Sequence, residues 1–242
     1  MNPANRLAQI SFTAGPAALL AGWFLMRPIH GGLEPGPWWT AAHLAWLAAF
    51  AMFGLMTLAM RGLAMRDPSR PVTGGRRVAV ESMTVLALFG VAANLAQLVI
   101  DLYTGFAAAD GEALRGLLDD VKGFPGVEPV VYGPGAQLFY AAVLAQAVVL
   151  AVLRRVTPVS AAVTAGGVVL LAVATFEAGR NSALVALGMA VLWLGTLLLG
   201  RGRPAGTGTD TGTGTDTGTA TPAPGSRGQG ATTSRTSTQL LR

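Results

Sequence analysis

The segment "PGPWWTAAHLAWLAAFAMFGLMTLAM", Pro35 to Met60, contains no charged residue and decides the fold class. A helix needs about 20 apolar residues to cross a hydrocarbon core of about 30 Å, and this segment is longer than that. The segment is continuously apolar, whereas the strands of a transmembrane barrel are short and alternate polar with apolar residues. It therefore predicts a helix that spans a membrane.

Further uncharged blocks of similar length lie on both sides of this segment. They cover residues 7–26, 82–100, 129–153, 156–176 and 181–200. The mean hydropathy is +0.51 and only 12% of the residues are charged, which is unlike an ordinary soluble domain. Residues 1–200 are thus predicted to form an all-α, polytopic transmembrane helix bundle. Its six spans are expected at about 8–26, 40–60, 79–101, 135–153, 159–177 and 182–200.

The positive charges divide unevenly between the two sides of the predicted spans. One side receives 13 of the 17 Lys and Arg residues, and the other side receives four. Because cytoplasmic connections are enriched in Lys and Arg, both termini are predicted to be cytoplasmic. The protein is accordingly expected to be a multi-pass protein of a bacterial plasma membrane. The arginines lie at span ends without interleaved aromatic residues, so they do not indicate a nucleic-acid partner.

The composition changes abruptly after Gly200. Residues 201–242 contain runs such as "GTGTDTGTGTDTGTATPAPG" and almost no apolar residue that a core could bury. Burial could not repay the entropy lost on ordering such a chain, so a disordered, Gly/Thr-rich cytoplasmic tail is predicted. It is interpreted either as a docking or modification segment or as an idle low-complexity extension.

The connection from Thr104 to Pro134 is predicted to be external and contains one amphipathic segment. In "DGEALRGLLDDVK" the apolar residues recur at helical spacing; they are Leu114, Leu117, Leu118 and Val121. Asp110 or Glu112 is expected to cap the start of this helix. Two interpretations remain open: a lid over an external cavity, or a connector whose apolar face rests on lipid or on neighbouring helices. We favour the connector.

A polar stripe lies near the external end of the third predicted span, in "NLAQLVIDLYTG". At about 100° per residue, Asn94, Gln97 and Asp101 fall within roughly 60° of one another, so they share one helix face. Asn94 should lie about 10 Å deeper than Asp101. His43 opens the second span on the same side. The stripe could be interhelical packing glue, which we favour, or one wall of an externally open polar vestibule.

Two further candidates, Glu177 and Arg180, lie in the predicted hairpin between the last two spans. Their spacing of three residues suits a pair that holds the turn, although they could also face the vestibule. The sequence has two histidines, His30 and His43, and no cysteine. Neither the HExxH spacing nor three zinc ligands can be found, so no metal site and no cofactor are predicted.

The segment "EPGPWWTAAHLAWLAAFAMFGLMTLAMRG", Glu34 to Gly62, resembles the uncharacterised small multi-pass integral membrane proteins of high-GC actinobacteria. In those proteins a short external loop with Pro and Trp runs into a helix that opens with Ala-His. The likeness covers roughly the first three spans. It implies a bacterial membrane context and supplies no catalytic residues.

The residues thus predict a non-enzymatic integral membrane protein with a structural or partner-binding role. The alternative is a small permease or solute sensor, cation- or proton-linked, that uses Asp101 with Gln97, Asn94 and His43. An enzyme is disfavoured because no nucleophile or metal constellation accompanies Asp101 and His43. The expected partners are the lipid bilayer and either another protein or a second copy of the chain; a small-molecule ligand cannot be named.

Overall fold

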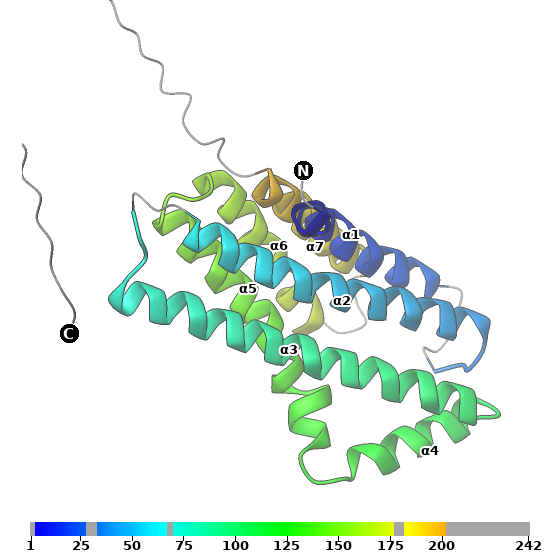
Figure 1. Cartoon of the computed structure of the whole chain (residues 1–242). Coiled ribbons are helices and arrows are strands. Elements are labelled where there is room, and N and C mark those ends of the chain that lie inside the picture. Colours follow the sequence, from blue (N-terminus) through cyan, green and yellow to red (C-terminus); the bar gives the residue numbers. More distant parts are fainter. Residues whose placement is uncertain (1–2, 28–32, 67–69, 177–181, 202–242) are drawn as a thin grey trace, which may run out of the picture. The chain divides into compact units, whose positions relative to one another are not determined.

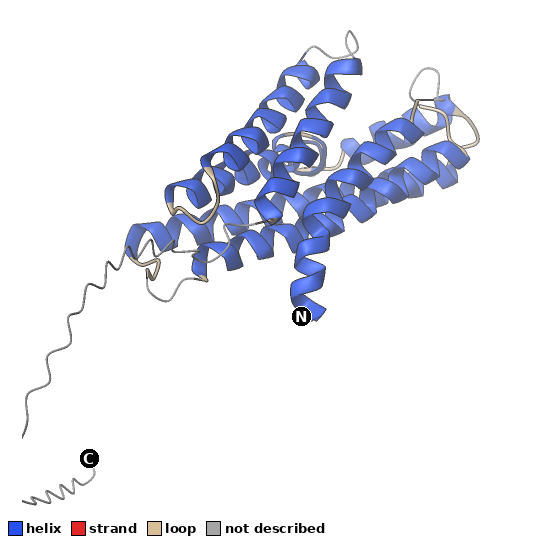
Figure 2. Ribbon diagram, turned by 90° about the horizontal axis from the view of Figure 1, so that it is seen from above, coloured by secondary structure: helices blue, strands red, loops and turns tan. Residues whose placement is uncertain are grey.

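The computed structural model describes residues 3–27, 33–66, 70–176 and 182–201, and what it describes is helical, without strands (Figures 1 and 2). This confirms the predicted all-α class. The helices are α1 (Pro3–Leu25), α2 (Pro37–Met65), α3 (Gly74–Ala107), α4 (Gly111–Lys122), the short π-helical turn η1 (Glu128–Tyr132), α5 (Pro134–Val152), α6 (Pro158–Phe176) and α7 (Ser182–Gly200). The predicted tail from residue 202 onward lies outside the described residues.

Five of these helices are long and apolar enough to cross a membrane: α1, α2, α3, α5 together with η1, and α7. The apolar part of α6, Pro158–Ala174, is shorter. Many large apolar side chains on these helices point away from the bundle, including Val85, which is 65% exposed, and Val169, which is 51% exposed. An apolar exterior of this extent suits lipid as the surrounding solvent, so the protein is a multi-pass membrane protein.

The six long helices contact one another in a closed ring. In order around the ring, the neighbours are α1, α2, α3, α5, α6 and α7, and α7 packs back against α1. In Figure 1, α2 and α3 run side by side in opposite directions, so the start of α2 lies near the end of α3. We call this the α4 end, because α4 follows α3 there. The opposite end, where α2 ends and α3 begins, is called the arginine-rich end.

Three aromatic rings fill the middle of the bundle. Phe50, Phe53 and Phe139 are at most 4% exposed, and their ring centroids are 4.8–5.5 Å apart. Beside them Gly90 of α3 meets the backbone of Phe139 of α5 so closely that a Cβ on Gly90 would clash. This aromatic layer lies between the polar groups of the α4 end and those of the arginine-rich end.

Candidate functional site

The structure brings together His43 and Asp101, two of the residues singled out from the sequence. His43 lies near the start of α2 and Asp101 near the end of α3, and the antiparallel packing of these helices places them side by side. The His43 Nε2 atom is 3.7 Å from the Asp101 Oδ2 atom. Both residues are buried, with 3% and 6% of their surface exposed.

The orientation of the His43 ring is set by the backbone one turn earlier. His43 Nδ1 is 2.7 Å from the carbonyl oxygen of Trp39, and a carbonyl can only accept a hydrogen bond, so Nδ1 carries a proton. The ring lies between two tryptophans, with centroids 4.1 Å from Trp39 and 5.2 Å from Trp46. Its Nε2 atom is therefore left to face the Asp101 carboxylate.

The Asp101 carboxylate has two further partners. The Tyr132 hydroxyl, in η1, donates to Asp101 Oδ1 at 2.8 Å, and the Gln97 side chain also interacts with this carboxylate. The indole of Trp39 donates to the Asp101 backbone carbonyl at 2.9 Å. Tyr132 and Trp39 were not among the candidates, because nothing in the sequence connects Tyr132, in a Pro- and Gly-rich loop, with a side chain on α3.

A proton between His43 and Asp101 makes this arrangement favourable. If the imidazole is neutral with its proton on Nδ1, the Nε2 lone pair faces a carboxylate oxygen, and the two acceptors repel each other. The repulsion becomes attraction when one proton is added, either to Nε2 or to Oδ2. Because the pair is buried, the negative charge of the Asp101 carboxylate is also costly, even with the hydrogen bond from Tyr132. His43 and Asp101 thus form a two-residue site suited to holding one proton.

Helix α4 covers the site. Its apolar residues Leu114 and Leu118 are 0% and 7% exposed and pack with Trp39, Tyr132 and their neighbours in a small hydrophobic cluster of their own. Asp110 caps the helix by accepting hydrogen bonds from the backbone N–H groups of Glu112 and Ala113. The predicted amphipathic helix and its cap at Asp110 are thereby confirmed, and its apolar face rests on the protein.

Asn94 lies deeper than the His43–Asp101 pair and has a different role. Its amide nitrogen donates to Gly90 of its own helix at 2.7 Å and to Ala136 of α5 at 2.9 Å. The side chain thus ties α3 to α5, as interhelical glue would. Farther toward the arginine-rich end, Gln146 of α5 donates to Thr84 of α3 at 3.2 Å and is a second bridge between the same two helices.

The remaining candidates, Glu177 and Arg180, lie outside the described residues. In the part of the chain that the structure covers, no group of three or more His, Cys, Asp or Glu side chains is placed to hold a metal ion. His43 and Asp101 alone are too few ligands for a structural zinc site.

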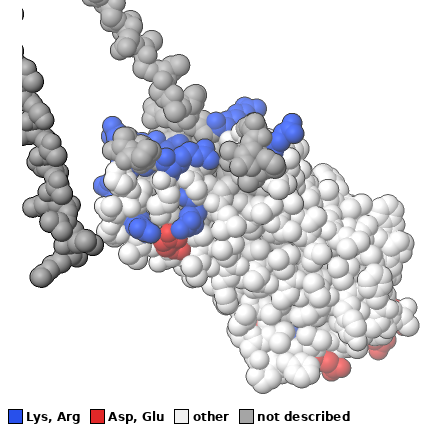
Figure 3. Space-filling model, viewed as in Figure 1, with Lys and Arg blue, Asp and Glu red and all other residues white. Residues whose placement is uncertain are grey.

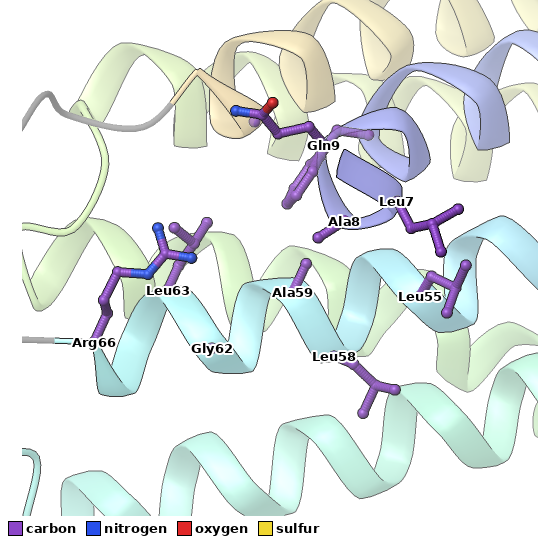
Figure 4. A pocket seen from close by; sticks show the side chains of 11 residues that line it. Leu7, Ala8, Gln9, Leu55, Leu58, Ala59, Gly62, Leu63 and Arg66 are labelled. Atoms are coloured by element: carbon purple, nitrogen blue, oxygen red, sulfur yellow. The ribbon is translucent and has the colours of Figure 1, made fainter. Parts of the chain in front are cut away.

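A separate groove opens between α1 and α2 toward the arginine-rich end (Figure 4). It has a volume of about 510 Å³, and most of its lining is apolar, with Leu7, Leu55 and Leu58 among the side chains shown. Arg66 lies at one end of the groove. The lining suits hydrocarbon chains, whereas converging polar groups that could carry chemistry are found at the α4 end.

In comparisons with known proteins, no family model, no curated sequence and no solved structure matches this chain.

Proposed function

We propose that the chain is a six-span protein of a bacterial plasma membrane with both termini in the cytoplasm. The sixth span is α6, and its packing on α7 supports this. Glycines bring the two antiparallel helices into close contact at three levels: Gly188 meets Leu171, Gly167 meets Leu192, and Gly195 meets Thr164. Helix α7 is long and apolar enough to span a membrane, and α6 packs against it at all three levels. Helix α6 should therefore extend through the same thickness of the membrane as α7.

The proposed orientation rests on the charges at the two ends. Lys and Arg side chains gather at the arginine-rich end of the visible face, whereas Asp and Glu appear mainly near the α4 end (Figure 3). Cytoplasmic ends of membrane proteins carry such an excess of Lys and Arg. The arginine-rich end is accordingly assigned to the cytoplasm and the α4 end to the outside.

Within this architecture we propose a non-enzymatic sensor that responds to external protons. The observation that carries this proposal is the buried His43–Asp101 pair, whose facing acceptor atoms, 3.7 Å apart, attract each other only when one of them carries a proton. Ionisable residues inside membrane domains are costly and commonly mark a proton or ion site. Helix α4, which covers the pair from the external side, is the element that a change of protonation would move.

The response to acid follows from the charges around the pair. With one proton the pair is internally balanced. A second proton leaves a buried imidazolium without a carboxylate partner, and the ammonium of Lys122, 5.1 Å from the Tyr132 ring, adds a nearby positive charge. Burying an unpaired charge is strongly unfavourable, so acidification should favour a state in which α4 lifts and water reaches His43.

A structural role is the second candidate function, and Asn94 favours it. The Asn94 amide bridges two helices with both bonds satisfied internally, and the His43–Asp101–Tyr132 cluster could likewise serve as a fixed staple that holds α4 in place. A staple would keep α4 closed throughout the physiological pH range, whereas a sensor would not.

Quenching of Trp39 fluorescence by acrylamide separates the two candidates. Trp39 is 4% exposed and lies beneath α4, so it reports water access to the pair. Its contribution is obtained by comparing purified protein with a Trp39→Phe variant. The second proton is added to a pair that already holds one, so the measurement extends from about pH 8 to about pH 4, below the usual titration of histidine. Over this range the sensor proposal expects Trp39 to become more accessible to quencher.

Two variants test whether His43 causes the pH response of the Trp39 fluorescence. His43→Gln should abolish the pH response, whereas His30→Gln, which removes the other histidine of the sequence, should leave it intact. A Trp39 signal that is equally shielded at both pH values in the unmodified protein would reject the sensor and leave the staple as the better account.

A further inference from the structure

The two proton acceptors of the buried His43–Asp101 pair have different surroundings. A single proton can reside on Nε2 of His43, which gives an imidazolium next to a carboxylate, or on Oδ2 of Asp101, which gives two neutral groups. In a buried site the neutral form is favoured unless neighbouring groups compensate both charges of the ion pair. The contacts of each residue therefore decide where the proton resides.

Hydrogen-bond donors gather around the Asp101 carboxylate. The Tyr132 hydroxyl donates to Oδ1 at 2.8 Å, and the Gln97 side chain also hydrogen-bonds to this carboxylate. Lys122, in the last turn of α4, adds a positive charge that acts on the same group. A hydrogen bond to an ionised acceptor is roughly twice as strong as one between neutral groups, so these donors favour the carboxylate over the carboxylic acid.

The contacts of His43 favour a positive charge on its ring. The carbonyl oxygen of Trp39, 2.7 Å from Nδ1, accepts a stronger hydrogen bond from an imidazolium than from a neutral imidazole. The Trp39 ring also lies against the imidazole, with centroids 4.1 Å apart and planes inclined by 30°. An aromatic face within about 6 Å attracts a cation. The backbone and the ring of Trp39 thus both stabilise the protonated form of His43.

We propose that Tyr132 is a positioning residue that keeps Asp101 ionised and thereby holds the single proton of the pair on Nε2 of His43. Transfer of this proton to Oδ2 would break one N–H bond and form one O–H bond, and no other reactant takes part. It would also leave the Tyr132 hydroxyl donating to a neutral carboxyl group, which is a weaker acceptor. Tyr132 reaches Asp101 from η1, so its bond links the charge of the carboxylate to the chain that follows α4.

The location of the first proton identifies the group that receives the second one. When both ring nitrogens of His43 carry protons, the next proton of the pair binds to the Asp101 carboxylate. In the described part of the chain, the charged and titratable groups that act on this carboxylate are His43, Tyr132 and Lys122. Protonation of Asp101 removes the negative charge that all three groups stabilise. The movement of α4 that follows rests on the proposed sensor, whereas the location of the first proton does not.

Two kinds of spectra locate the first proton in the purified full-length protein at neutral pH. Nitrogen NMR of isotope-labelled histidine reports the protonation of each ring nitrogen, and a His30→Gln variant identifies the signals of the other histidine. Infrared spectroscopy detects the band of a protonated carboxyl group, and comparison with Asp101→Asn assigns this band to Asp101. We expect protons on both ring nitrogens of His43 and no protonated-carboxyl band from Asp101.

The Tyr132→Phe variant tests the positioning role, because it removes the hydroxyl and keeps the ring. We expect the proton to shift from Nε2 toward Oδ2, so that the protonated-carboxyl band of Asp101 appears and the signal of protonated Nε2 weakens. The matched control is Tyr103→Phe, which removes a hydroxyl from a tyrosine of α3 that is 71% exposed. The control should leave both spectra unchanged.

Each outcome of these measurements supports or overturns the proposal. In the unmodified protein, either an unprotonated Nε2 of His43 or a protonated-carboxyl band from Asp101 would overturn it, whether or not Tyr132→Phe folds. A Tyr132→Phe protein that melts at a lower temperature but keeps the proton on Nε2 would make Tyr132 a structural contact and overturn its positioning role. Neither spectrum requires α4 to move, so the location of the proton and the sensor proposal fail separately.

Discussion

At the scale of single residues, Asn94 and Asp101 show how one polar stripe can serve two purposes. Both lie on the buried face of α3, two helical turns apart. Asn94 meets backbone carbonyl groups, which neither gain nor lose protons, and therefore acts as a fixed bridge. Asp101 meets an imidazole and a phenol, so its interactions depend on protons.

Substitutions of Asn94 test the bridge. Asn94→Leu should lower the free energy of unfolding by about 0.6 to 2 kcal/mol, the usual range for hydrogen bonds between membrane helices. Asn94→Asp should be worse, because a carboxylate cannot donate to the two carbonyl oxygens that it would face. Unfolding in mixed micelles with increasing detergent denaturant measures both changes. An aspartate variant as stable as the unmodified protein would contradict the bonding pattern at this residue.

The sequence predicts part of this residue-scale chemistry. Helical periodicity is enough to place Asn94, Gln97 and Asp101 on one face, because about 100° per residue is a local property of the backbone. Tyr132 could not be predicted in the same way. It reaches Asp101 only through the path of the chain from α4 through η1, which depends on tertiary packing and has no periodic signature. The contact between His43 and the Trp39 carbonyl oxygen could not be predicted either, because every residue has a backbone carbonyl and the sequence does not indicate which one accepts a side-chain hydrogen bond.

At the scale of elements, small residues decide how closely helices approach. The contact between α3 and α5 depends on Gly90, which lies against the backbone of Phe139 and also supplies the carbonyl that accepts from Asn94. The hairpin of α6 and α7 uses three glycines in the same way. Close approach of backbones is the usual basis of helix association in membranes, where lipid is as apolar as the side chains.

Gly90→Ala should separate α3 from α5. The added Cβ would clash with the Phe139 backbone, which cannot rotate away as a side chain could, and overpacking of this kind costs about 1 to 3 kcal/mol. Gly54→Ala on α2 is the matched control, since its Cβ would find only Val91 at an ordinary 3.6 Å. Alanine favours helix over glycine by up to about 1 kcal/mol, so the control should be neutral or stabilising. Equal effects of the two substitutions in mixed-micelle unfolding would contradict a specific contact at Gly90.

Element boundaries were harder to predict than the presence of helices. The third span is predicted at about 79–101, whereas α3 extends from Gly74 to Ala107. Charged residues such as Arg76, Arg77 and Glu81 end an apolar block without ending a helix, because their backbones still hydrogen-bond within it. The presence of helix α4 was predicted from its regular apolar spacing, and of the two expected capping residues, Asp110 and Glu112, the structure assigns Asp110.

At the scale of the whole bundle, buried or charged polar groups gather at the two opposite ends of the ring of helices. The His43–Asp101 pair lies beneath α4 at one end, and a cavity lined by Arg70, Arg76, Arg154 and Arg155 lies at the other. The aromatic layer of Phe50, Phe53 and Phe139 lies between them.

Labelling of single cysteines tests the proposed topology, because the native chain has no cysteine that would interfere. Gly116 on α4 and Gly75 at the start of α3 both have open space where a side chain would be added, so cysteine fits at either position. A third cysteine at Thr232 reports on the C-terminal segment. In intact cells a membrane-impermeant maleimide should label Gly116→Cys only, and the other two should react after the cells are made permeable.

The Thr232 position decides whether α6 crosses the membrane. With six spans, residue 232 lies on the same side as Gly75, whereas with five spans it lies on the same side as Gly116, and the other two labels do not change. In a reversed orientation, the cysteines at Gly75 and Thr232 would be labelled in intact cells and the cysteine at Gly116 would not. The close contacts along α6 and α7 favour the six-span outcome, since an α6 outside the membrane could not keep Gly167 against Leu192 and Gly195 against Thr164 while α7 spans. External labelling at Thr232 together with Gly116 would reject the sixth span, and with it the proposal of two cytoplasmic termini.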